Sequence, residues 1–327
     1  MKRRAFIAML GGAALAPSVS WPLPLSAQER TPRVGILLNG GAVVPRDLEI
    51  ARELARIGYI EGRSINYEVR GAAGDLSRLP QLARELAATK PDAIVGSGTP
   101  AAAALFGATR NIPIVMTAVG DPVALGLTGS IARPTHNVTG FTVSSLSLAA
   151  KRLELLHGIV PALRKVAYLW VPGNPMATLF EAQVRKAADV LGIKLVSLPL
   201  TSEADIAAAF TVADEEQVTA VLVQSDPLTL RFSVTIVDEC LVRNLPGMHT
   251  WPIEVRNGAL ISYGPPAVEN NSRAAIYVDR ILKGAKVAEL PFEEPTQIKL
   301  VINLRTARSI GFAFPPTLLA RADEVIE

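Results

Sequence analysis

One glycine-rich segment stands out as a place where the chain can bind a small molecule. The segment GSGTPA, residues 96–101, lies where a predicted strand meets a predicted helix, and it contains Ser97, Gly98 and Thr99. Its glycines let backbone approach a ligand closely, and its two hydroxyl groups can donate hydrogen bonds. The free N–H groups at a helix start favour an anion, by roughly 0.3–1 kcal/mol at an exposed site. We therefore predict contact with a carboxylate; the alternative is that Thr99 only caps its own helix.

The same six residues fit the pattern G-x-G-x-x-A, so an enzyme that binds a nucleotide is an alternative. In dinucleotide-binding domains this loop follows the first strand, whereas here it follows the third. No general acid or base stands out in the sequence. We therefore interpret the segment as a solute-binding loop and expect neither catalysis nor a cofactor.

Four more polar residues follow predicted strands and are candidate ligand contacts. They are Asn39 after the first strand, Asp121 after the fourth, and Asn174 and Asp226 after two strands of the second half of the chain. Each of the two aspartates precedes a proline. Either carboxylate could accept hydrogen bonds from a ligand ammonium, and either could instead cap the helix that follows it.

Two aromatic residues and one serine complete the candidate binding set. Trp251 and Tyr263 lie near the ends of late strands, where their rings could stack on a ligand or pack in the core or hinge. Ser145 lies in the segment that joins the two halves of the chain. The three histidines stand far apart and show no zinc-ligand spacing, so we predict no metal site.

The elements that must position these residues alternate between strands and helices. This alternation predicts an α/β fold in which helices cover both faces of parallel sheets. The series restarts after residues 137–145, which predicts two similar lobes. In the first half we expect strands at 33–38, 64–71, 92–98 and 112–119, with helices at 46–58, 75–90 and 100–110. In the second half we expect strands at 165–170, 193–198, 220–225 and 259–264, with helices at 146–160, 174–192, 202–217 and 227–244.

The first 27 residues have the features of a secretory signal peptide. Lys2, Arg3 and Arg4 precede a short apolar stretch, and small residues precede a cut expected after Ala27. The paired arginines also resemble a twin-arginine export signal, so both export routes remain open. Three of the 33 basic residues lie in this segment, which leaves 30 residues of each sign. We therefore expect a periplasmic protein that does not bind nucleic acid.

Six segments, in this order along the chain, carry a resemblance to a known family. The segments are GSGTPAA, IPIVMTAVGDPVALGLTGSIARP, NVTGFTVSS, KRLELLHGIVP, ISYGP and LVINLRTARSIGFAFPPTLLARADEVIE. Together they resemble the ABC transporter substrate-binding proteins of the TrpX-like type. The resemblance runs from about Arg33 to Glu327 and implies a type I periplasmic-binding fold, with two Rossmann-like lobes joined by a three-segment hinge. The implied crossings lie near 141–145, 262–266 and 291–299, with lobe 1 at 31–143 plus 264–293 and lobe 2 at 144–263 plus 294–327.

The resemblance also implies what the protein does. Better understood members bind amino acids or similar small organic acids, and their lobes close around the ligand. By position, Ser97, Gly98 and Thr99 would hold a carboxylate, and Asp121, Asn174 and Asp226 would line the cleft. We therefore expect a monomeric periplasmic solute-binding protein that delivers its ligand to an inner-membrane ABC permease. A ligand sensor for a membrane receptor is the alternative, because the same lobes serve both purposes.

Overall fold

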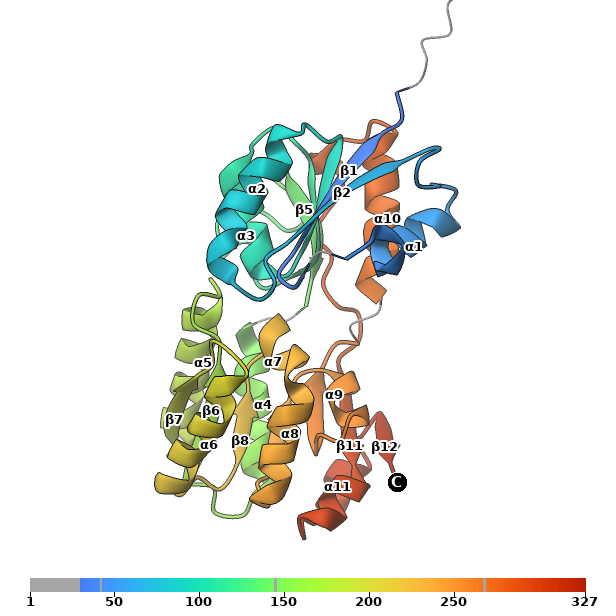
Figure 1. Ribbon diagram of the computed structural model, residues 1–327. Helices are drawn as coiled ribbons and strands as arrows, with labels where there is room; N and C mark the ends of the chain where they lie inside the picture. Colours follow the sequence, from blue (N-terminus) through green and yellow to red (C-terminus); the bar gives the residue numbers. More distant parts are fainter. Residues whose placement is uncertain (1–29, 42, 144–145, 267–268) are drawn as a thin grey trace, which may run out of the picture. The chain divides into compact units, whose positions relative to one another are not determined.

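The computed structural model describes residues 30–327 except 42, 144–145 and 267–268. The predicted signal peptide, residues 1–27, and the candidate Ser145 lie outside the described residues. The described chain contains two β-sheets that are covered by helices (Figure 1). The α/β fold of two predominantly parallel sheets, predicted from the alternation of strands and helices, is confirmed.

The first sheet is entirely parallel and has the strand order β2-β1-β3-β4-β5. Alternate side chains of a strand point to opposite faces, so neighbouring apolar residues enter two separate cores. Ile36 packs with the core that includes helices α1 and α10, and Leu37 packs with the core that includes α2 and α3. Helices α2 and α3 lie side by side (Figure 1). The strands are β1 (Arg33–Leu38), β2 (Asn66–Gly71), β3 (Ala93–Ser97), β4 (Ile114–Val119) and β5 (Val138–Thr142), and the helices are α1 (Glu49–Arg56), α2 (Leu79–Ala88), α3 (Thr99–Ala108) and α10 (Glu269–Leu282).

The second sheet has the strand order β12-β11-β10-β9-β8-β6-β7. Its strands are β6 (Lys165–Trp170), β7 (Lys194–Pro199), β8 (Val221–Val223), β9 (Gly247–His249), β10 (Ile261–Gly264), β11 (Lys299–Asn303) and β12 (Glu324–Ile326). The pair β10–β11 is antiparallel, which differs from the prediction of parallel pairing. The chain leaves this sheet at the carboxyl end of β10, forms α10, and returns to the sheet at that same end. Strand β11 therefore runs in the direction opposite to β10.

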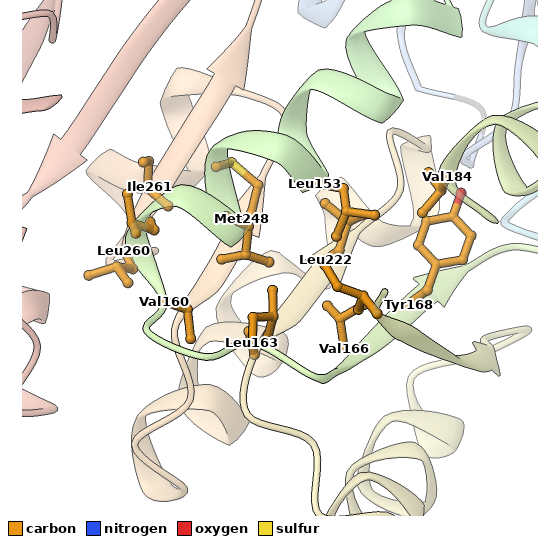
Figure 2. Close-up of a cluster of buried hydrophobic side chains, with 14 of the residues drawn as sticks. Leu153, Val160, Leu163, Val166, Tyr168, Val184, Leu222, Met248, Leu260 and Ile261 are labelled. Atoms are coloured by element: carbon orange, nitrogen blue, oxygen red, sulfur yellow. The ribbon is translucent and has the colours of Figure 1, made fainter. Parts of the chain in front are cut away.

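Helices cover both faces of the second sheet as well. One face carries the large apolar cluster of which Figure 2 shows a part, including Leu153 of α4, Val184 of α5 and Leu222 of β8. The other face carries a separate cluster with residues of α6 and α8, such as Phe210 and Ile236. The helices of this half are α4 (Leu146–Ile159), α5 (Ala177–Leu191), α6 (Ala204–Glu215), α7 (Pro227–Arg231), α8 (Ser233–Val242), α9 (Pro252–Arg256), α11 (Leu304–Ser309) and α12 (Pro316–Leu319), and short 3-10 turns lie at η1 (Pro45–Asp47), η2 (Leu76–Arg78) and η3 (Val287–Glu289).

Two predicted elements differ from the structure in an informative way. The helix predicted at 227–244 is two helices, α7 and α8, because Phe232 leaves helical geometry with φ −98° and ψ 17°. The segment predicted only as a join, 137–145, contains strand β5, which forms an edge of the first sheet. Its backbone also exchanges hydrogen bonds with Glu293, whose N–H donates to Gly140 and whose carbonyl accepts from Thr142.

Gly140 provides a test of how closely β5 packs on β4. Its φ is +139°, and a Cβ atom added there would lie 2.2 Å from the carbonyl oxygen of Met116. We expect Gly140→Ala to lower the free energy of unfolding by roughly 2–4 kcal/mol, because backbone atoms must move to admit the methyl group. Urea denaturation measures this change.

Gly107 in α3 is the matched control, since an added Cβ meets no atom within 4 Å. We expect Gly107→Ala to raise the free energy of unfolding by up to about 1 kcal/mol, because alanine favours the helix. Equal effects of the two substitutions would contradict the packing described for Gly140.

Candidate functional site

A cavity of about 230 Å³ lies where strands of both sheets end. In parallel sheets the loops after the strands gather at one edge, and ligands bind there. The lining residues are Ser97, Gly98, Thr99, Thr117, Ala118, Gly120, Val143, Asn174, Phe180, Ser225, Asp226, Pro227, Leu230, Trp251 and Asn270. Six of the ten residues expected from the sequence are therefore brought together around one cavity.

The loop after β3 is held in shape by a glycine and an asparagine. Gly98 has a φ of +85° and precedes the first turn of α3, and a Cβ atom there would lie 2.5 Å from Nδ2 of Asn39. That amide group donates a hydrogen bond to the carbonyl oxygen of Ser97 at 2.9 Å. This hydrogen bond holds the loop in place. Asn39 does not line the cavity of about 230 Å³ and instead lines a second cavity of about 260 Å³.

Thr99 joins two of the loops that line the cavity. It is the first residue of α3, and its hydroxyl oxygen accepts a hydrogen bond from the backbone N–H of Gly120 at 2.9 Å. The loop after β4 is therefore fixed to the loop after β3. The hydroxyl hydrogen of Thr99 remains available to donate, and the first N–H groups of α3 have no partner within the helix. This edge of the cavity offers donors and a helix dipole that suit an anionic group.

Asp226 supplies the opposite chemistry from the second sheet. Its side chain is buried, with 3% of the residue exposed. One carboxylate oxygen accepts from the amide group of Asn174 at 2.6 Å, and the other accepts from the N–H of Leu228 at 2.7 Å. The second of these bonds caps α7, so Asp226 is both a helix cap and a cavity residue.

The pKa of Asp226 is raised to about 6, mainly because burial removes its carboxylate from water. The hydrogen bonds from Asn174 and Leu228 act in the other direction and lower this pKa, but they do not offset the effect of burial. A buried carboxylate of this kind is stabilised by a cation or by further donors. The site therefore offers a place for a positively charged group beside Asp226.

Trp251 and Phe180 make the apolar part of the lining. Trp251 is 8% exposed, and its backbone N–H donates to the buried carboxylate of Glu254 at 2.7 Å. Another oxygen of that carboxylate lies 3.1 Å from Nδ1 of His249. This buried pair fixes the loop after β9 and holds Trp251 at the cavity.

Three sequence candidates are not placed at this cavity, and Ser145 lies outside the described residues. Asn39 is occupied with the carbonyl of Ser97, as described above. The carboxylate of Asp121 accepts from the N–H groups of Val123 and Ala124 at 3.0 and 2.9 Å, so it caps its own loop. The ring of Tyr263 packs against the apolar cluster of the second sheet, and its carbonyl accepts from Nε of Arg152 at 2.7 Å.

Sequence reasoning missed several residues that line the cavity. Ser225 and Gly120 lie in the same loops as the predicted Asp226 and Asp121, but only the two acids were chosen there as ligand contacts. Phe180 and Asn270 come from the helices α5 and α10, and no local motif marks them. Their contribution depends on how helices pack on the sheets.

Other kinds of site find no support in the described part of the chain. No group of three or more His, Cys, Asp or Glu residues there could hold a metal ion. Burial raises the pKa of Cys240 to about 12, so its thiol stays protonated at neutral pH. Among the residues that the structure describes, no helix has the length and apolar character that a membrane span requires.

Comparison with known proteins gives the class of protein. The family model described as ABC transporter substrate binding protein matches residues 42–326. The chain therefore belongs to the family of ABC transporter substrate-binding proteins, and the resemblance noted in its sequence is confirmed. Its fold is that of the type I periplasmic binding proteins, and its role is to bind a small organic solute for a transporter.

Individual relatives agree with this assignment. The chain is 26% identical over 254 residues to the tyrosine-binding protein of Clostridioides difficile (strain R20291), covering 77% of this chain and 72% of that protein. It resembles the structure of a conserved domain protein from Vibrio cholerae with 28% identity and a TM-score of 0.81, covering 90% of this chain and all of that one. It also resembles the ABC domain from Streptococcus pneumoniae in complex with L-Trp, with 25% identity and a TM-score of 0.79 over the same shares.

The hydrogen bond between Asn174 and Asp226 leads to a prediction about acidity. We expect Asn174→Ala to raise the pKa of Asp226 further above about 6, because this bond stabilises the charged form. A carboxyl-carbon NMR titration measures the pKa. The matched control is Thr229→Val, which removes bonds to the backbone carbonyls of Gln224 and Asp226 and none to the carboxylate. An unchanged pKa in the Asn174 variant would contradict the described role of this bond.

Proposed function

We propose that this substrate-binding protein captures a small α-amino acid in the cavity of about 230 Å³. The observation that carries the proposal is the pairing of a donor-rich helix start, at Ser97–Thr99, with the buried carboxylate of Asp226 in one cavity. A carboxylate and an ammonium group on the same small molecule satisfy both. The ligands of two relatives, tyrosine and L-Trp, have this pair of groups.

The size of the cavity supports a small solute. Pockets that hold drug-sized ligands have volumes of roughly 300–1,000 Å³, and this cavity is smaller. Phe180 and Trp251 give it an apolar wall, which suits the hydrocarbon or aromatic part of a side chain. The proposed ligand is thus charged at one end and largely apolar at the other.

The cavity is formed by two halves of the chain that we propose as lobes, with boundaries at 31–143 plus 264–293 and at 144–263 plus 294–327. The ring of Pro227 lies 3.4 Å from where a Cβ on Gly98 would stand, so the two halves touch beside the cavity. A ligand that contacts both halves stabilises this arrangement relative to a separated one. We propose that the ligand-bound form is the one recognised by an ABC permease.

Export to the periplasm is part of the same proposal. It is supported by the basic and apolar character of residues 1–27 and by the membership of the chain in a family that serves transporters. We propose that the protein acts there by binding alone, without catalysis. Mixing the purified protein with its ligand should therefore return the ligand unchanged.

The test is isothermal titration of residues 28–327 with the L-amino acids, after bound solutes have been removed by unfolding and refolding. At least one should bind, and its decarboxylated and deaminated analogues should bind at least about tenfold more weakly, because each loses a charge-assisted hydrogen bond worth about 1.5–3 kcal/mol. Binding of no α-amino acid would refute the proposal.

The matched variants are Asp226→Asn and Asp121→Asn. We expect the first to weaken amino acid binding about 10- to 100-fold, because the ammonium loses its charged partner. The second should leave binding unchanged, since Asp121 bonds only to its own loop among the described residues. Equal affinities of the two variants would contradict the assignment of Asp226.

The pKa of Asp226 also predicts a pH dependence. The ligand ammonium requires the carboxylate form, and in the free protein this form is lost as the pH falls below about 6. Affinity should therefore be constant from pH 7 to 8 and fall by about tenfold per pH unit well below pH 6. Titrations from pH 5 to 8 measure it, and Asp226→Asn should flatten the profile. A wild-type affinity that does not change over this range would contradict the role of Asp226.

A further inference from the structure

A small chamber of about 10 Å³ adjoins the ligand cavity in the second half of the chain. Phe180 and Ser225 line both spaces, so the two spaces are neighbours. The chamber is also lined by Arg152 of α4, Tyr168 of β6 and Gln224, which follows β8. Its size corresponds to about one water-sized group.

Three side chains of this chamber carry buried polar atoms without a partner among the described residues. Nη2 of Arg152, the hydroxyl oxygen of Tyr168 and both polar atoms of the Gln224 amide have no hydrogen-bond partner among the described residues. Figure 2 shows the Tyr168 hydroxyl beside Val184, which also lines the chamber. A buried polar group without a partner destabilises the fold, so native proteins rarely leave several together. The chamber is thus built to receive a polar atom.

The chemistry of Arg152 restricts what that atom can be. Arginine only donates hydrogen bonds, and its Nε already donates to the carbonyl of Tyr263 at 2.7 Å. Burial lowers the pKa of Arg152 to about 10, so the guanidinium remains charged at neutral pH. The group that meets Nη2 must therefore accept a hydrogen bond. An oxygen atom fits, whereas a hydrocarbon end or an indole N–H does not.

We propose that this chamber is the far end of the ligand site and receives an oxygen atom at the tip of the ligand side chain. The inference rests on the proposed binding of an α-amino acid and specifies its class, one with a terminal oxygen on an apolar side chain. Gln224 and Tyr168 complete the hydrogen bonds of that oxygen, because an amide and a hydroxyl can each donate or accept. The protein then prefers L-tyrosine to L-phenylalanine, which differs only by this atom.

Isothermal titration with these two amino acids tests the inference. We expect wild-type protein to bind L-tyrosine at least about tenfold more tightly than L-phenylalanine. The substitutions Gln224→Met and Tyr168→Phe keep the approximate shape and remove the bonding atoms. Each should weaken L-tyrosine binding by about tenfold and leave L-phenylalanine binding unchanged, a difference that general damage to the fold would not produce.

Tyr67→Phe is the control, because Tyr67 also has a hydroxyl without a described partner but belongs to the first sheet. It should change neither affinity. Equal wild-type affinities for the two amino acids, or variants that weaken both equally, would overturn the oxygen subsite and leave the proposed amino acid function in place. Failure of every α-amino acid to bind would overturn both.

Discussion

A carboxylate that is almost entirely removed from water is the constraint on which the site depends. Asp226 is 3% exposed, and burial raises its pKa to about 6 in spite of bonds from Asn174 and Leu228. Burying a charge is unfavourable unless the charge is paired. The loops after β6 and β8 are thus arranged around a buried acid, and this arrangement supports the proposed binding of an ammonium group.

The fold brings Asp226 close to the start of α3, although the two lie far apart in the sequence. Parallel strands deliver their following loops to one edge of a sheet, and the chain builds two such sheets. One edge presents the start of α3 with Thr99 and Gly120 bonded together, and the other presents Asn174 and Asp226. The cavity is lined by both, which supports the proposal of a solute with two charges of opposite sign.

Much of this arrangement could be predicted from the sequence, because it follows from local chemistry. Alternating apolar segments predict the strands, and the glycines, proline and hydroxyls of residues 96–101 predict a binding loop. The two Asp-Pro pairs show where local reasoning ends. Each of the two aspartates is followed by a proline. Among the described residues, the Asp121 carboxylate bonds only within its own loop, whereas the Asp226 carboxylate also accepts a hydrogen bond from Asn174. That difference is set by tertiary packing and has no signal in either loop.

The same limit explains the residues that were missed. Phe180 and Asn270 reach the cavity from the helices α5 and α10, and a helix residue is directed to a ligand only by how the helix packs. The antiparallel pairing of β10 with β11 likewise depends on the route of the chain out of the second sheet and back. Local patterns predict elements and loop chemistry, while the facing surfaces between elements require the assembled fold.

The most direct measurement is a crystal structure of the protein grown with the L-amino acid that it binds most tightly. The account predicts that the ligand ammonium lies within hydrogen-bonding distance of the Asp226 carboxylate, and that the ligand carboxylate meets the residues 97–99 at the start of α3. A ligand bound elsewhere, or one whose carboxylate faces Asp226, would contradict it.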